Sequence, residues 1–253
     1  MSAAARAIAW LVPEAPPERA RVARTLVSAF ATVYVLVRFR YFGDMSRHHA
    51  PDFTPVGVCS ILTEPLPPSA SWVLTATSIA LGGAFTLGMG VRIVGPLFFF
   101  ALTWVVSYAS SWGKILHSEN LFVLHVLVFA LAGEITDARK AGWALRAASV
   151  ATVLTYLVAG VTKLRSGGDA WLSGQALGDW LAWDALRKIE LGSFHSPLAE
   201  LVAGSPALVQ VLAIYTLVVE IGAPLALASR RASRAWALLA GAFQAGILAT
   251  MAI

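Results

Sequence analysis

Seven apolar runs, most of them close to the length of a membrane-spanning helix, divide this chain. A helix needs about 20 mostly apolar residues to cross a hydrocarbon core of about 30 Å. Of the 253 residues, 58% are hydrophobic and 13% are charged, whereas a soluble domain is about 25% charged. The sequence therefore predicts an all-α fold, a polytopic transmembrane helix bundle with about seven spanning helices, at residues 22–39, 71–90, 93–112, 120–133, 143–164, 206–228 and 235–253.

Basic residues gather in alternate segments between these runs. One set comprises the N-terminal arginines, Arg92, the pair Arg139 and Lys140, and three arginines between residues 230 and 234. Because cytoplasmic loops carry the excess of Lys and Arg, these segments are expected on the cytoplasmic side. Residues 1–20 are then a cytoplasmic N-terminal segment, and residues 21–253 form a single domain in the plasma membrane. Orientation and lipid headgroups account for the net charge of +5, so no nucleic-acid partner is expected.

Two longer segments, 41–70 and 166–205, fall on the outer side. The second carries Trp171, Trp180 and Trp183 among apolar residues at helical spacing. This pattern is typical of an amphipathic helix that lies in the membrane interface with its aromatic rings at headgroup level. The sequence predicts an outer interfacial or re-entrant helix here, which would cover the end of the bundle above Lys163.

Lys163 lies at the end of the fifth run, on the outer side of the membrane. A charged amine at this depth is costly, so the side chain reaches for water, pairs with an acid or loses its proton. One interpretation is an anchor at the membrane surface, beside Arg165. The other is a desolvated amine that acts as a base near neutral pH. Its position alone leaves both interpretations open.

Glu220 is the clearest carboxylate inside an apolar run. Pro224 follows four residues later, which removes the usual donor to the carbonyl of residue 220 and favours a kink. Carboxylates inside membrane helices face the protein interior and mark functional sites by default. A purely structural partner for a nearby arginine or hydroxyl is the alternative.

The start of the fourth run is rich in polar side chains. A serine N-cap followed by an acid and an amide in the first turn is ordinary helix-starting chemistry. The same group is expected at the outer mouth of the bundle, where Lys163 also ends, so it is a candidate for substrate binding. Its members are His117, Ser118, Glu119 and Asn120, and His125 further along is expected to be a hydrogen-bonded interior imidazole.

Metal, disulfide and nucleotide chemistry are not expected. His48 and His49 are adjacent in a proline-rich loop, near Asp44 and Asp52, and lack the spacing of metal ligands. Cys59 is the single cysteine, so no intramolecular disulfide can form, and we interpret it as a small packing residue. The chain has no phosphate loop, dinucleotide fingerprint, GxSxG or CxxC motif.

Two stretches resemble a known family. They are His117-Ser-Glu-Asn-Leu-Phe-Val-Leu-His125 and Tyr156-Leu-Val-Ala-Gly-Val-Thr-Lys163-Leu164, the latter followed by Trp171-Leu-Ser-Gly174. They are similar to the HTTM proteins, which share the membrane domain of vitamin K-dependent gamma-carboxylase, and Glu220-Ile-Gly-Ala-Pro224 resembles the next helix of that family. The block Ala-Gly-x-x-Lys-Leu with Trp-Leu-x-Gly is the most specific part.

The resemblance implies a reduced quinone of the vitamin K or menaquinol type as cofactor. In the carboxylases the matching lysine deprotonates the hydroquinone, so Lys163 would be the catalytic base in an outward-facing pocket. Residues 117–120, Trp171 and Glu220 would then shape the substrate site. The loops contain no counterpart of the large extramembrane domain of the carboxylases, and Thr162 stands where a second lysine is expected. Carboxylation of a protein substrate is therefore not expected.

The competing hypothesis is a non-catalytic membrane scaffold, or a lipid- or quinone-binding subunit with a membrane protein partner. In that case the same polar residues lock helices together. Both hypotheses place the chain in contact with the lipid bilayer.

Overall fold

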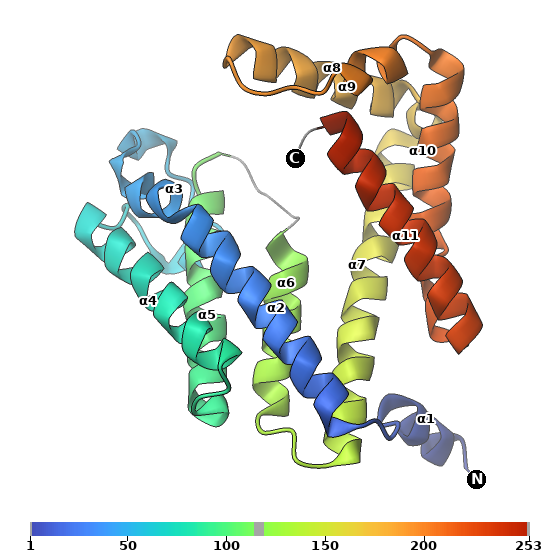
Figure 1. Ribbon diagram of the computed structural model, residues 1–253. Coiled ribbons are helices and arrows are strands. Elements are labelled where there is room, and N and C mark those ends of the chain that lie inside the picture. The colour runs from blue at the N-terminus through green and yellow to red at the C-terminus, as the bar shows by residue number, and fades with distance from the viewer. Residues whose placement is uncertain (1, 114–118, 252–253) are drawn as a thin grey trace. The chain divides into compact units, whose positions relative to one another are not determined.

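The computed structural model describes residues 2–113 and 119–251, and all regular elements within these ranges are helices (Figure 1). The chain divides into two compact units, Met1–Ala151 and Thr152–Ile253. The long helix α7 begins in the first unit and continues into the second. The division of the chain into a short N-terminal segment and a single domain over residues 21–253 stays a prediction.

In the described part of the first unit, α1 to α6 precede the start of α7, and three 3-10 turns lie between α3 and α4. Two prolines, Pro17 and Pro68, occupy the first helical positions of α2 and α4, where a missing N–H is harmless. The elements are α1 (Ala3–Leu11), α2 (Pro17–Val37), α3 (Phe39–Asp44), η1 (Met45–Arg47), η2 (Ala50–Asp52), η3 (Gly57–Ile61), α4 (Pro68–Thr86), α5 (Val91–Ser110), α6 (Glu119–Ala132) and α7 (Ala138–Leu172).

Helices α2, α4, α5 and α6 pack side by side around an aromatic core. Glycines allow the closest approaches. A Cβ at Gly82 would lie 2.3 Å from Thr32 Oγ1, and one at Gly95 would lie 3.2 Å from the backbone of Ala130. Small residues at helix contacts are characteristic of packing in lipid, where there is no hydrophobic drive between helices.

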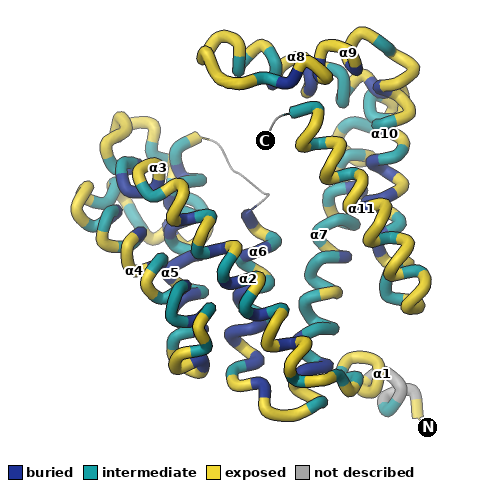
Figure 2. Tube along the Cα trace, in the orientation of Figure 1, coloured by how far each residue is buried: buried dark blue, intermediate teal, exposed yellow. Residues whose placement is uncertain are grey.

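The outward face of α2 is apolar. Leu26, Phe30, Val33 and Val37 are all exposed within the protein (Figure 2). A helix with a water-facing surface would carry charged residues on this side. The face is suited to contact with lipid.

Among the residues that the structure describes, three helices are long and apolar enough to cross a membrane: α2, α5 and α7. A fourth span results if α9 and α10, which meet at a bend of 102°, are counted together. These helices indicate a membrane protein, as expected. Each of the seven predicted runs overlaps a helix, but α6 is a shorter apolar helix, so the number seven stays a prediction.

The second unit contains the rest of α7 and the C-terminal helices. Helices α8 and α9 lie across one end of α7, α10 and α11 (Figure 1). The predicted helix after Trp171 is present as α8. Near Pro224, where a kink is expected, α10 ends at Ile221 and the 3-10 turn η4 follows. The elements are α8 (Gln175–Glu190), α9 (Pro197–Ala203), α10 (Pro206–Ile221), η4 (Ala223–Leu227) and α11 (Arg230–Met251).

Candidate functional site

A partly buried ion pair joins α7 to α10. The ammonium group of Lys163 donates a hydrogen bond to Oε1 of Glu220. The side chain of Glu220 is only 4% exposed and that of Lys163 is 24% exposed. Both residues are predicted members of one site, and they are in direct contact. The amine therefore points into the helix bundle and toward an acid.

Gly160 makes this contact possible. It lies one helical turn before Lys163 on α7. A Cβ at this position would lie 2.9 Å from Cβ of Glu220 and 2.9 Å from Cγ1 of Ile221. Real Cβ atoms do not come so close to other atoms, so only glycine lets α10 approach α7 here. The glycine thus sets the distance across which Lys163 and Glu220 meet.

Trp171 returns to Lys163 through a break in α7. Gly168 has φ 42° and ψ −119°, which is outside helical geometry and favours glycine. A Cβ at Gly167 would lie 2.3 Å from Cδ1 of Trp171, so the indole uses the space beside this glycine. The ammonium nitrogen of Lys163 lies 5.2 Å from the centre of the Trp171 ring. This is a cation–π distance, and it puts an aromatic surface next to the ion pair.

Gly174 fixes the chain after Trp171 against α10. Its φ is +86°, and a Cβ there would lie 2.7 Å from the backbone of Gln210. The amide of Gln210 donates a hydrogen bond of 3.2 Å to the carbonyl of Leu172. The segment between α7 and α8 is therefore held on both sides, and it keeps Trp171 in place.

Helix α11 supports the same region. Gln244 donates a hydrogen bond of 2.8 Å to the hydroxyl of Tyr156, whose ring meets that of Trp236 edge-on at 5.0 Å. The indole N–H of Trp236 donates to the carbonyl of Val219, next to Glu220, at 2.9 Å. Tyr156 and Trp236 are not among the predicted site residues. The one sequence signal is that Trp236 and Gln244 lie about two helical turns apart on α11, a spacing that ordinary packing also produces.

The residues predicted at the start of the fourth run have different surroundings. Glu119 is buried in the first unit and accepts a hydrogen bond from the hydroxyl of Tyr34. The guanidinium group of Arg38 lies 4.1 Å from the centre of the Tyr34 ring. Asn120 is exposed, while His117 and Ser118 lie outside the described residues. The structure thus groups Lys163, Trp171 and Glu220, and it places Glu119 in a second polar cluster with Tyr34.

His125 is an interior residue, as expected. Its Nε2 lies 3.1 Å from the carbonyl oxygen of Ala148, which is the geometry of a hydrogen bond. The imidazole therefore joins α6 to the start of α7 within the first unit.

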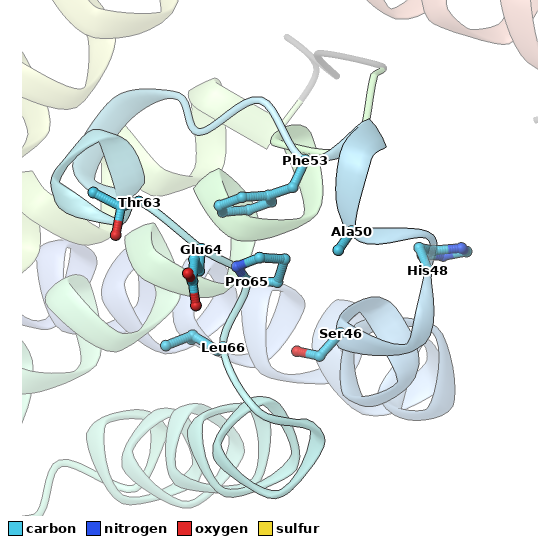
Figure 3. A pocket seen from close by; sticks show the side chains of 8 residues that line it. All are labelled: Ser46, His48, Ala50, Phe53, Thr63, Glu64, Pro65 and Leu66. Carbon is cyan, nitrogen blue, oxygen red and sulfur yellow. The ribbon is translucent and has the colours of Figure 1, made fainter.

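The loop between α3 and α4 contains an open hollow of about 430 Å³ (Figure 3). The ring of His48 points away from the other side chains that line it and lies 5.6 Å from the ring of Trp112. In the described ranges, no group of three or more His, Cys, Asp or Glu residues is placed to hold a metal ion. The lining residues are Ser46, His48, Ala50, Phe53, Thr63, Glu64, Pro65 and Leu66.

Helix α8 turns its ionic side inward. Asp184 is buried and pairs with Lys188 at 2.8 Å and with Arg187 at 3.0 Å. Burial acts to raise the pKa of Asp184, but the hydrogen bonds from Lys188 and Arg187 outweigh it and hold the pKa below its usual value. Lys188 also donates to the carbonyl of Met251 in the last turn of α11. The exposed side of α8 carries Trp180, Trp183 and Leu186.

No family model matches this chain, and neither the curated proteins nor the solved structures give a match. The site is therefore interpreted from its own residues.

Proposed function

We propose that this chain is an HTTM-like integral membrane protein that uses a reduced quinone, with Lys163 as the base that accepts a proton from the hydroquinone. The observation that carries the proposal is the pairing of Lys163 with a buried carboxylate, beside the face of Trp171. An amine, an acid and an aromatic surface are the groups that binding and deprotonation of a phenolic ring require.

Because Lys163 is paired as an ammonium ion, it must lose its proton before it can act as a base. An ammonium ion cannot accept a proton. Glu220 would have to take the proton of Lys163 across their hydrogen bond. The neutral amine then accepts the proton of a hydroquinone hydroxyl. A bound hydroquinone would supply the acidic hydroxyl, and Lys163 would hold the proton that it gives up.

The groups around Lys163 fit a hydroquinone. The indole of Trp171 offers a flat surface for the ring, and the close helix contact at Gly160 keeps Glu220 within reach of the amine. Bound hydroquinone would supply the electrons of the reaction. The role of this chain is to orient the ring and to move the proton.

The proposal includes the membrane arrangement expected from the sequence. It has seven spanning helices in the plasma membrane, a cytoplasmic N-terminus and a site that faces outward. Helix α8 lies in the outer interface, and the exposed Trp180, Trp183 and Leu186 support this placement because amphipathic aromatic residues favour the headgroup region. Glu119 and Asn120 belong to the proposed substrate site.

Oxygen uptake by the purified, reconstituted protein with a menaquinol-type hydroquinone tests the activity. We expect quinol-dependent uptake in the wild type and its loss in Lys163→Ala. Arg165→Ala is the matched control, because Arg165 is a nearby basic residue that is exposed. If the wild type consumes no oxygen, or if Lys163→Ala consumes as much as the wild type, the proposal is wrong.

The same ion pair also favours a second function, a non-catalytic scaffold or a lipid- or quinone-binding subunit. The contact ties α7 to α10, so it can serve stability alone. This hypothesis expects a stable membrane protein partner in co-purification. It also expects that Lys163→Ala lowers the melting temperature while any quinone binding persists.

A further inference from the structure

Arg24 is a buried cation that has no anionic partner among the described residues. It lies on α2 and is only 9% exposed. Within residues 2–113 and 119–251, its guanidinium group makes no hydrogen bond and no ion pair, and its Nε is completely covered. Its ring contact is with Phe85, whose centre is 5.7 Å from the guanidinium carbon. A buried charge is costly unless it is paired. An anion that is not among the described residues would therefore stabilise this arginine.

The charged side chain whose field acts on Arg24 is another cation, which makes the unpaired charge less favourable. Arg21 lies one turn earlier on α2, and its Nε donates to the carbonyl of Ile135 at 3.1 Å. The nearby acid Glu134 pairs with Arg92 at 3.6 Å. The hydroxyls of Thr86 and Ser28 already donate to backbone carbonyls. The surroundings of Arg24 therefore offer positive charge and hydroxyl groups.

The guanidinium group is directed at the turn between α4 and α5. Its Nη2 lies 3.0 Å from the position that a Cβ would take at Gly88. Helix α5 begins after this turn, and its N-cap is Gly90, with φ 52° and no side-chain cap. The first N–H groups of a helix have no partners within it and attract anions. The buried arginine of α2 thus points at a turn that leads into an uncapped helix N-terminus.

We propose that Arg24 and the α4–α5 turn bind a phosphate oxyanion. A guanidinium group binds phosphate through two parallel hydrogen bonds, and a helix N-terminus adds backbone donors. Two sources share this chemistry, the phosphate of an anionic phospholipid and inorganic phosphate. Exposed Leu87 and Met89 flank the turn and give acyl chains an apolar surface. The expected cytoplasmic orientation of this turn places it at the leaflet rich in anionic lipids.

The test compares the wild type with Arg24→Gln and Arg19→Gln in a neutral detergent. Arg19 is an exposed arginine on the same helix, so its substitution controls for a general loss of surface charge. Thermal unfolding is followed with added phosphatidylglycerol, phosphatidylcholine, inorganic phosphate or sodium chloride. Native mass spectrometry counts the bound lipids.

We expect phosphatidylglycerol to stabilise the wild type and Arg19→Gln. It should bind Arg24→Gln at least about tenfold more weakly than it binds the wild type, because a charge-assisted hydrogen bond is lost. Without added anion, Arg24→Gln should melt at the same temperature as the wild type or higher, because an unpaired buried charge is removed. If inorganic phosphate stabilises the wild type but not Arg24→Gln, the site holds with the soluble anion as its ligand.

Three results would overturn the proposal. The first is equal stabilisation of Arg24→Gln and wild type by phosphatidylglycerol. The second is equal stabilisation of the wild type by phosphatidylcholine or by sodium chloride, which would remove the need for a phosphate site. The third is a lower melting temperature of Arg24→Gln without any anion, since Arg24 would then stabilise the fold through its own contacts.

Discussion

Replacing Lys163 and replacing Glu220 should lower the free energy of unfolding by different amounts. In Lys163→Met the carboxyl group stays shielded from water, since the side chain of Glu220 is 4% exposed. The change that costs this carboxylate the least free energy is to take up a proton. For a carboxylic acid with an ordinary pKa of about 4.3, this costs about 4 kcal/mol at pH 7. In Glu220→Gln the amine is 24% exposed and can keep some water, so we expect a loss of about 1–2 kcal/mol.

Unfolding of the detergent-solubilised protein in denaturant, followed by helical circular dichroism, measures these differences. The loss in Lys163→Met should shrink to about 1 kcal/mol at pH 5, where protonation of a carboxylic acid is cheaper. The loss in Glu220→Gln should change little over this range. The double variant has no charge in the contact, so its loss should fall short of the sum of the single losses by about 2 kcal/mol.

Additive losses would refute this account of the pair. Equal losses in the two single variants, or a loss in Lys163→Met that does not depend on pH, would also contradict it. Arg165→Met is the control, because Arg165 is exposed and its substitution should change stability by less than about 0.5 kcal/mol.

Three further predictions concern other parts of the chain. Burial raises the pKa of the Cys59 thiol to about 11. A maleimide should therefore label the native protein slowly at pH 7.5 and the SDS-denatured protein rapidly. The free energy of unfolding should begin to fall only above about pH 9. Asp184→Asn should lower the free energy of unfolding by about 2 kcal/mol. Since the pKa of Asp184 is lowered in the folded protein, the wild type should lose this stabilisation in melting experiments as the pH falls below about 4. Gly174→Ala should cost about 2 kcal/mol because of its positive φ and the nearby backbone of Gln210, whereas Gly178→Ala, with an ordinary contact of 3.5 Å, should be neutral or slightly stabilising in the same assay.

The helices could be predicted from the sequence because apolar length is a local property. Each predicted run overlaps a helix, and α8 lies where the tryptophan-rich pattern predicts a helix. The breaks within and between helices were harder to predict from the sequence. Helix α7 continues past Lys163 to Leu172 with a single non-helical residue at Gly168, and α9 meets α10 at 102°. Such angles depend on contacts between distant segments, such as Gly174 against Gln210, which no periodicity reports.

The site could be predicted in part for a related reason. Intramembrane charge singles out Lys163 and Glu220 directly, because ionisable groups are rare at that depth. Their direct contact depends on how α7 and α10 are rotated, and this follows from Gly160, whose missing side chain leaves no hydrophobic signal. Tyr156 and Trp236 could not be singled out, because an aromatic residue at helical spacing is usually part of the packing.

The two interpretations of Lys163 make different demands on its surroundings. An anchor would extend its amine toward water and would need neither a buried acid nor an aromatic face. Here the amine binds Glu220 and lies over Trp171, and three glycines, Gly160, Gly167 and Gly174, leave the space that these contacts use. Such convergence disfavours a surface anchor. A structural lock and a proton-transfer pair both remain consistent with it, and they separate on one point: a lock needs the charges to stay where they are, whereas a base needs the proton of Lys163 to move to Glu220.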